Sequence, residues 1–382
     1  MISENNINKL KKKHTPFFVY DLSLLQKTIT SLKKHAGNDY KIHYALKANP
    51  NPKLLELIQQ AGLGADCVSG NEIKQSIKSG FKTSDIVFAG VGKSDQEINY
   101  ALEQNIFCFN IESVSELIVI NQLASKQNKT AHIALRINPN VDALTHKYIT
   151  TGLEENKFGI NPYEFDEVLE IIKQLKHIKL IGLHFHIGSQ ITTLGPFKKL
   201  CKRVNEINKW FIDQGVFPQT INLGGGLGIN YEEPDNSSIV DFKSYFDVFR
   251  KHLELRPKQK VHFELGRSIV GQCGSLIASV LHIKKGITTN FAILDAGMTD
   301  LLRPALYQAY HKIENISSKS SEVLKYDVVG PICESSDCFG KAVLLPVTNR
   351  GDLIAIRSAG AYGEAMSSNY NLRKAAGKMY LK

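Results

Sequence analysis

The 382-residue sequence predicts an α/β fold: a (β/α)8 barrel of the TIM type followed by a β-rich domain of sandwich or barrel-like form. Two observations lead to this fold class. Eight short apolar, β-branched runs alternate with segments that carry apolar residues every three or four positions. After residue 270, strand-like runs follow one another without long helical segments. We therefore expect the barrel over residues 22–270, and residues 1–21 and 271–382 in the β-rich domain.

The predicted barrel strands are spread evenly along the first two thirds of the chain. In order they are His43–Ala48, Ala65–Val68, Ile86–Ala89, Phe107–Ile111, His132–Asn138, Ile181–His186, Thr220–Leu223 and Val261–Leu265. The segments between them, such as 51–61 and 113–125, have the i, i+3, i+4, i+7 pattern of helices that face a core. Parallel strands need such covering crossovers, which favours a closed barrel. A doubly wound sheet is the alternative.

The β-rich domain is predicted from five later runs. They are Leu276–Ile283, Phe291–Asp295, Asp327–Pro331, Ala342–Val347 and Asp352–Ser358. The early run Phe17–Tyr20 is expected to join them, because a closed barrel has no open edge for another strand. The segment 139–160 after the fifth barrel strand exceeds ordinary connection length, and we expect a lid or active-site rim there.

Composition excludes several classes of protein. With 43% hydrophobic and 22% charged residues, the chain can bury a large core and is not of disordered composition. No apolar stretch approaches the length of a membrane span, and residues 1–18 lack the apolar core of a secretory signal, which predicts a cytoplasmic protein. The net charge of +10 is dispersed among acidic residues. That dispersal argues against nucleic-acid binding and suits attraction of a small anionic substrate.

Two sets of residues raise the possibility of a bound metal. Cys333 and Cys338 are spaced like a ligand pair, but no second pair accompanies them, so we expect reduced thiols and no structural zinc. His184 and His186, with His262, suggest a metal-dependent hydrolase. No carboxylate-rich ligand set occurs at the other strand ends, so these histidines are expected to be packed or to serve another role.

Polar residues gather where the predicted barrel strands end, which is where barrel enzymes carry their chemistry. These residues are Lys47, Asp66, Arg136, His186 with Ser189, Gly224–Gly226, and Glu264 with Arg267. Taken alone, Lys47 could be a surface lysine, Gly224–Gly226 a tight turn and Glu264 a surface glutamate. Their common position at one end of a barrel favours a shared site.

A lysine and a phosphate cradle together indicate pyridoxal phosphate. Lys47 follows small and apolar residues, so a partly desolvated amine could form a Schiff base with a carbonyl. The triple glycine leaves backbone N–H groups open to a phosphate, after a strand where many barrels bind one. Pyridoxal phosphate needs both groups. Glu264 would then keep the ring nitrogen protonated, and His186 would lie against the ring.

These residues occur within segments that resemble the diaminopimelate decarboxylase family, fold-type III pyridoxal-phosphate enzymes. The segments, between Phe17 and Tyr370, are YALKANPNPKLLELIQQAGLGADCVSGNE, FAGVGKSDQE, GLHFHIGSQI, NLGGGLGINY, ELGRSIV, DAGMTDLLRPALY, GPICESSD and GAYGEAMSSNYN. The resemblance implies a barrel with a C-terminal β-domain and a homodimer with shared active sites. It also implies conversion of meso-2,6-diaminopimelate to L-lysine and CO2, the last step of lysine biosynthesis.

The same resemblance assigns roles to individual residues. It implies cofactor contacts from Lys47, Asp66, His186, Ser189, Gly224, Gly225, Gly226, Glu264, Gly266, Arg267 and Tyr362. It implies substrate contacts from Arg267, Arg303, Tyr307, Glu334 and Tyr362, with Glu334 at the distal amino group. Lys47 and Cys333 match the catalytic residues, Cys333 as a proton donor from the neighbouring subunit. The sequence has ELGR where many relatives have EPGR, which leaves the ligand residues in place.

Other functions remain as alternatives. Related decarboxylases act on ornithine, arginine or carboxynorspermidine, but these substrates lack the second amino-acid end that Arg303, Tyr307 and Glu334 would hold. A racemase needs the same lysine and cradle, whereas a strongly protonating Glu264 favours decarboxylation. A non-catalytic carrier of the cofactor would need only a barrel, and the β-rich domain with Cys333 argues against it.

Overall fold

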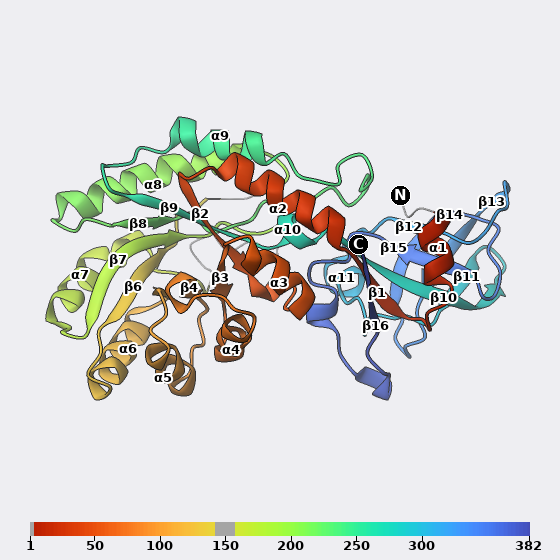
Figure 1. Ribbon diagram of the computed structural model, residues 1–382, viewed down its shortest axis with the longest axis horizontal. Helices are drawn as coiled ribbons and strands as arrows, with labels where there is room; N and C mark the ends of the chain where they lie inside the picture. Colours follow the sequence, from red (N-terminus) through yellow and green to blue (C-terminus); the bar gives the residue numbers. More distant parts are fainter. Residues whose placement is uncertain (1–3, 142–156) are drawn as a thin grey trace. The chain divides into compact units, whose positions relative to one another are not determined.

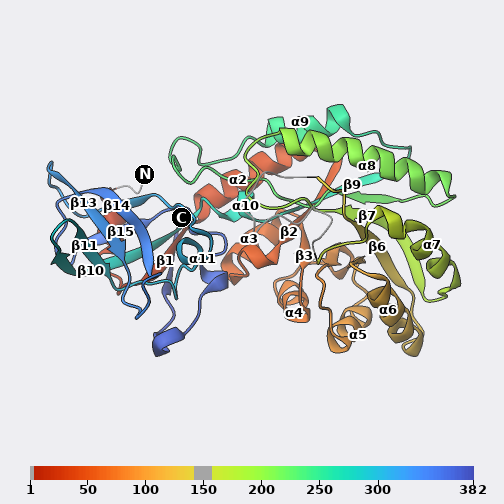
Figure 2. The same cartoon turned by 180° about the vertical axis from the view of Figure 1, so that it is seen from behind.

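The computed structural model describes residues 4–141 and 157–382 in two compact units (Figures 1 and 2). The barrel unit comprises Ile29–Gly228 and Asp241–Gly266. The β-rich unit comprises Met1–Thr28, Ile229–Val240 and Arg267–Lys382.

The barrel unit contains a closed barrel of eight parallel strands, as predicted. The strands are β2 (Tyr40–Ala45), β3 (Gly64–Cys67), β4 (Ile86–Phe88), β5 (Cys108–Ile111), β6 (Ala131–Ile137), β7 (Ile178–Phe185), β8 (Thr220–Asn222) and β9 (Lys260–Leu265). Each strand pairs with the next in sequence, and β9 pairs with β2. The first prediction was misplaced by three residues: β2 ends at Ala45, and Leu46–Ala48 form a short 3-10 helix, η1. Lys47 therefore lies just beyond its strand.

Helices lie outside the barrel strands (Figure 1). They are α3 (Pro52–Gln60), α4 (Gly70–Lys78), α5 (Asp95–Glu103), α6 (Val114–Lys126), α7 (Phe165–Gln174), α8 (Gly195–Asp213) and α9 (Phe242–His252), while α2 (Leu22–Ala36) precedes β2. Short polar side chains begin several of them. Ser94 and Glu97 form a reciprocal capping box at α5, and Ser69 accepts the N–H of Glu72 at α4, so N–H groups without helical partners are satisfied.

Aromatic packing fixes β9, the strand that carries Glu264. The ring of Phe263 on β9 meets Tyr245, Phe246 and Phe249 of α9 edge-on, with centroids 4.8 to 5.8 Å apart. Edge-to-face pairs of this kind favour one relative orientation of helix and strand. Because successive residues of a strand face opposite sides, Phe263 anchors β9 to the helix while Glu264 faces the barrel interior.

The β-rich unit contains one eight-stranded sheet, in the order β12-β15-β10-β11-β13-β14 with β1 beside β10 and β16 (Figures 1 and 2). Its strands are β1 (Phe17–Asp21), β10 (Gly274–Lys285), β11 (Asn290–Leu294), β12 (Ile313–Asn315), β13 (Val323–Val329), β14 (Cys338–Pro346), β15 (Leu353–Ile356) and β16 (Gly377–Leu381). The expectation that Phe17–Tyr20 joins this sheet is confirmed. The short strands β12 and β16 were not predicted. The helices of this unit are short: α1 (Glu4–Leu10), α10 (Arg267–Val270) and α11 (Arg303–Tyr307).

The predicted lid and the expectation of no membrane span can be compared only with the residues that the structure describes. Most of the predicted lid, residues 142–156, lies outside the described residues. At its end, Ile160 pairs with Ile137 as an extension of β6. In the described parts of the chain, no helix is both long and apolar enough to span a membrane.

Candidate active site

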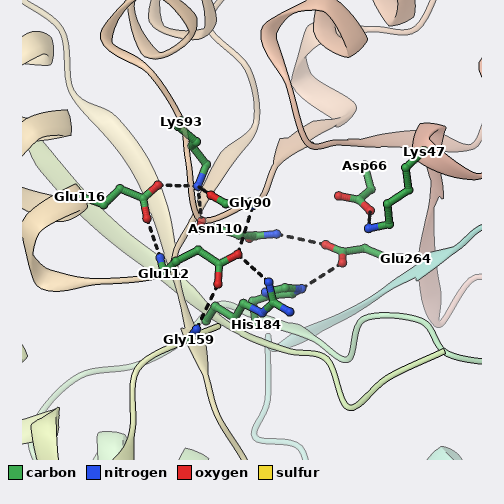
Figure 3. A network of polar contacts seen from close by, with 11 residues as sticks. Lys47, Asp66, Gly90, Lys93, Asn110, Glu112, Glu116, Gly159, His184 and Glu264 are labelled. Carbon is green, nitrogen blue, oxygen red and sulfur yellow. Dashed lines mark hydrogen bonds and ion pairs between the residues drawn. The ribbon is translucent and has the colours of Figure 1, made fainter. Parts of the chain in front are cut away.

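Lys47 and Asp66 lie together at the mouth of the barrel, where the strands end (Figure 3). Lys47 Nζ is 3.2 Å from Asp66 Oδ2. Asp66 is fully buried on β3, whereas the lysine side chain is partly exposed. Burial and the nearby charge of Glu264 raise the pKa of Asp66 to about 6, against the opposing effect of Lys47. The amine is thus held by a carboxylate but remains accessible.

Glu264 is a buried carboxylate surrounded by donors. Its Oε1 accepts hydrogen bonds from Asn110 at 3.1 Å and Asn222 at 2.7 Å, and its Oε2 accepts one from His184 Nε2 at 2.9 Å. Burial alone would raise the pKa of Glu264, but the interaction with His184 and the charge of Lys47 outweigh it and hold this pKa below its usual range. Glu264 therefore stays ionised, which excludes the surface-glutamate interpretation.

The three donors to Glu264 were not predicted from the sequence as its partners. Asn110, His184 and Asn222 come from β5, β7 and β8, each within two residues of the strand end. The usable signal was this common position, because polar side chains near strand ends face the barrel mouth. His184 had appeared only as half of a possible metal pair. Across the described residues, no three His, Cys, Asp or Glu side chains are grouped to hold a metal ion.

Gly224, Gly225 and Gly226 form a cradle that no other residue type could replace. A Cβ at Gly225 would lie 2.0 Å from the carbonyl oxygen of Glu264, and one at Gly224 would lie 2.3 Å from that of Phe185. Gly224 and Gly226 also have φ values of +65° and +102°. These positions therefore require glycine so that the turn can pack closely against the ends of β7 and β9.

His186 and Ser189 adjoin this cradle from the loop after β7. His186 Nδ1 accepts a hydrogen bond from Gly225 N at 3.2 Å. Burial and the charges of Arg136 and Lys47 hold the pKa of His186 well below its usual value, so the imidazole is neutral. The loop containing Ser189 is tied to the cradle by the hydrogen bond from Ile191 N to Gly226 O, 2.9 Å long. The predicted phosphate-binding residues therefore come together.

Gly266 has a packing role that explains its position after β9. A Cβ there would lie 2.9 Å from Cβ of Ala48 and 3.2 Å from Cβ of Ala45. Its absence lets the end of β9 pack closely against the segment that carries Lys47. Gly266 thus helps to set the separation between Lys47 and Glu264.

A second polar network, centred on Glu112, lies beside His184 and Glu264 (Figure 3). Glu112 accepts hydrogen bonds from Arg136 at 2.5 Å and from the backbone N–H groups of Gly90 and Gly159, each at 3.1 Å. Lys93 forms an ion pair with Glu116, which accepts the backbone N–H of Glu112 at 2.6 Å. These contacts join the ends of β4, β5 and β6 and fix the Arg136 guanidinium that helps to keep His186 neutral.

In the β-rich unit, two buried arginines lie among aromatic rings. Arg267 donates to the hydroxyl of Tyr231 at 2.6 Å and lies over the ring of Tyr362 at 4.7 Å. Arg303 lies over the ring of Tyr231 at 4.6 Å and donates to His311 Nε2 at 2.7 Å. Two neighbouring guanidinium groups suit the binding of carboxylates. Tyr231 and His311 were not predicted from the sequence.

The remaining predicted residues of this unit have separate contacts. Tyr307 ends α11 and is close enough to both arginines to affect their pKa values. Glu334 accepts a hydrogen bond from Tyr370 at 2.9 Å, and the backbone N–H of Cys333 donates to Asn371 at 3.4 Å. Cys333 is exposed rather than the buried apolar side chain that was its alternative interpretation. All six cysteines are free thiols.

Comparisons with known proteins agree with this chemistry. The family model "Pyridoxal-dependent decarboxylase, pyridoxal binding domain" matches residues 22–271. Diaminopimelate decarboxylase of Bacteroides thetaiotaomicron is 57% identical over 370 residues, 96% of each chain. That of Helicobacter pylori is 43% identical over 371 residues, 96% of this chain and 91% of the relative.

Solved structures show the same relationship. The crystal structure of Helicobacter pylori diaminopimelate decarboxylase complexed with L-lysine has a TM-score of 0.93 at 42% identity, covering 99% of this chain and 94% of that one. A lysine/ornithine decarboxylase from Vibrio vulnificus, at 22% identity and a TM-score of 0.86, shares the fold over the whole of this chain and 99% of its own. The chain therefore belongs to the diaminopimelate decarboxylase family of pyridoxal-dependent carboxy-lyases.

Proposed function

We propose that this protein removes CO2 from meso-2,6-diaminopimelate to form L-lysine, the last step of lysine biosynthesis, with pyridoxal 5'-phosphate as cofactor. The observation that carries the proposal is the buried, ionised Glu264 beside Lys47 and a glycine cradle. Full-length relatives named diaminopimelate decarboxylase and a lysine-bound neighbour support the choice of substrate and product.

The barrel residues fit the cofactor. Gly224, Gly225 and Gly226, with Ser189 beside them, are the proposed phosphate contacts, and Lys47 is the proposed nucleophile for the aldehyde carbon. Glu264 suits a protonated pyridine nitrogen, and the neutral His186 suits the ring face. When bound, the cofactor supplies an electron sink for the pair left behind by CO2. Asp66 holds Lys47, and Gly266, Arg267 and Tyr362 complete the proposed contacts.

The residues of the β-rich unit would select the substrate. Arg267 and Arg303 offer fixed guanidinium groups for carboxylates, Tyr307 and Tyr362 add hydroxyls, and Glu334 suits the distal ammonium group. Ornithine lacks the distal carboxylate. Arg303→Ala should therefore lose far more kcat/KM on meso-diaminopimelate than on ornithine or lysine. Equal losses on all three would show that Arg303 does not recognise the distal end.

We further propose a homodimer in which Lys47 acts with Cys333 of the second subunit. After CO2 leaves, the exposed thiol of Cys333 would return a proton to the same carbon. Refolding Lys47→Ala with Cys333→Ala protein should give about half heterodimers, each with one intact site, and about one quarter of wild-type activity. A confirmed heterodimer without activity would mean that both residues come from one subunit.

Product identification tests the function itself. The purified protein is incubated with meso-diaminopimelate, ornithine, arginine and carboxynorspermidine, and CO2 and amine products are measured. We expect CO2 and L-lysine from meso-diaminopimelate, and far slower turnover of the other three amino acids. Preferential turnover of another substrate would favour the related decarboxylases, and a racemised amino acid without CO2 would favour a racemase. We place the reaction in the cytoplasm, since six free thiols suit a reducing compartment.

A further inference from the structure

The amino-terminal end of the barrel, away from the strand ends that carry Lys47 and Glu264, contains a cavity. Its volume is about 810 Å³, within the range of sites for small molecules. The walls come from the beginnings of several strands, among them Lys41 on β2, His132 on β6, Lys179 on β7 and Lys260 on β9. No part of the proposed decarboxylation uses these residues.

The rim of this cavity has an excess of positive charge. It includes four lysines and two aspartates: Lys41, Lys179, Lys258, Lys260, Asp39 and Asp85. Lys41 is paired with Asp85 at 2.9 Å, and Asp39 faces Arg250 at 3.6 Å. Within residues 4–141 and 157–382, the other three lysines have no carboxylate partner. Their charges therefore act together on whatever occupies the cavity.

Strand order places two of these lysines on the two strands that pair with β8. His132 on β6 is the register partner of Lys179 on β7, and Thr220 on β8 is the partner of Lys260 on β9. Lys179 and Lys260 therefore stand on either side of β8. Lys258, two residues before Lys260, extends the cationic edge into the preceding loop.

The floor is aromatic and has one accessible ring nitrogen. Phe107 stacks on His262, with centroids 5.4 Å apart. His43 Nδ1 must donate to the carbonyl oxygen of Asp85 at 3.1 Å, so a neutral His43 accepts at Nε2 from His262 Nδ1 at 3.0 Å. This leaves His262 Nε2, which no described residue bonds and which is not sealed from solvent. Burial and the charges of His43 and Lys41 hold the pKa of His262 well below its usual value, so this nitrogen is an acceptor for a donor group on a ligand.

An exposed aromatic side chain completes the lining. Phe217 precedes β8 and leaves 43% of its surface in solvent although it borders the cavity. A flat molecule between Phe217 and the floor would bury this apolar surface. The cationic rim, the aromatic lining and the volume of the cavity together indicate a ligand that is both anionic and flat.

We propose that this cavity binds a small multivalent anion that carries a flat aromatic ring, with the anionic groups on Lys179, Lys258 and Lys260 and the ring against Phe217 and Phe107. The site is independent of the proposed decarboxylation and lies at the opposite end of the barrel strands. Phosphate and carboxylate groups share the required chemistry, and the probes below separate the anion from the ring.

The test is calorimetric titration of the cofactor-loaded protein with ATP and with inorganic pyrophosphate, both without Mg²⁺ and at fixed ionic strength. Loading with cofactor keeps the glycine cradle filled. Both probes should bind, ATP more tightly. Reversing two of the rim charges in Lys258→Glu/Lys260→Glu should weaken both by at least about tenfold, because each unit charge near a multivalent anion contributes on the order of 1 kcal/mol even in water.

Matched variants locate the binding. Lys198→Glu/Lys199→Glu makes the same change of net charge on exposed residues at the start of α8 and should leave both affinities within about twofold. Arg303→Ala should also leave them unchanged, which excludes binding at the arginines of the β-rich unit. Equal weakening by the α8 variant would mean non-specific attraction, and loss in Arg303→Ala would mean the other site. Either result overturns the proposal.

The ring contact has its own test. Phe217→Ala should weaken ATP several-fold and leave pyrophosphate unchanged. Leu255→Ala is the control, since Leu255 is also 43% exposed but does not border the cavity. Folding of each variant is checked by the visible absorbance of bound cofactor. If ATP binds no more tightly than pyrophosphate, or Phe217→Ala has no effect, the proposed ring contact is wrong.

Discussion

The barrel unit and the β-rich unit each contain a buried charged side chain that forms a hydrogen bond with a histidine. The histidine donates this bond in the barrel unit and accepts it in the β-rich unit. In the barrel, His184 donates Nε2–H to the carboxylate of Glu264. In the β-rich unit, His311 donates Nδ1–H to the carbonyl oxygen of Arg357 at 2.8 Å and accepts from the guanidinium of Arg303 at Nε2.

The difference follows from what the neighbours offer. A carboxylate can only accept and a guanidinium can only donate, so each fixes the role of the ring nitrogen facing it. Burial and the charge of Arg303 lower the pKa of His311 to about 3, which keeps its accepting nitrogen free of a proton. The barrel unit thereby presents a fixed negative charge and the β-rich unit a fixed positive one. The first suits a protonated cofactor ring and the second a substrate carboxylate.

The largest effect should come from the barrel side of this comparison, at Lys47. Lys47→Ala removes the amine that would bind the cofactor, so visible cofactor absorbance and nearly all turnover should disappear. Absorbance spectra and CO2 release measure both. Lys53→Ala, an exposed lysine on α3, is the control and should behave as wild type. If the Lys47→Ala protein kept its absorbance and activity, the proposed role of Lys47 at the barrel mouth would be wrong.

Removing the negative charge at Glu264 should have the next largest effect. Glu264→Gln keeps the shape of the side chain but cannot hold a ring nitrogen protonated, so the decarboxylation step should slow by about 10²-fold or more. Cofactor binding should persist and is followed by absorbance. Single-turnover rates isolate the step, and rates equal to wild type would contradict an electrostatic role for the carboxylate.

Acid should destabilise the protein through its neutral histidines. Burial lowers the pKa of His43 from 6.5 to about 4. Between these two pH values His43 is protonated in the unfolded chain but neutral in the folded chain. This contribution to stability is complete above pH 6.5 and is lost as the pH falls toward 4. Between pH 7 and 5 it amounts to about 2 kcal/mol.

Urea unfolding at the two pH values measures this loss. His43→Gln should lose about 2 kcal/mol less than wild type between pH 7 and pH 5, whatever its stability at pH 7. His14→Gln, at an exposed position, should show the wild-type difference. Equal pH dependence in all three proteins would show that His43 is protonated in the folded state.

The smallest effect is expected at His311, on the positive side of the comparison. His311→Phe removes the acceptor that holds the Arg303 guanidinium in position. Because a hydrogen bond to a charged group contributes about 1.5–3 kcal/mol, kcat/KM should fall about tenfold or more. The loss should fall mainly on KM, and His311→Gln should restore part of it through its amide oxygen. A change in kcat alone, or no rescue, would mean that His311 does not position Arg303.

The general outline of the protein was predictable from local pattern. Eight apolar runs separated by helical periodicity specify a parallel barrel, because parallel strands require crossovers and the two periods differ. The glycines at 224–226 could be assigned to the barrel mouth because they directly follow a strand, and their role in binding a phosphate is a proposal. Lys47 and Glu264 were placed by the same rule, although β2 ended earlier than expected.

Only the tertiary structure decided what surrounds the charged groups. The donors to Glu264 come from β5, β7 and β8, and a pattern within one strand carries no information about which side chains meet across a barrel. The pairing of β1 with β16 likewise joins residues about 360 positions apart, from Phe17–Gly377 to Asp21–Leu381. Such contacts depend on loop closure and packing rather than on local periodicity, so the sequence determined the elements and the fold determined their electrostatics.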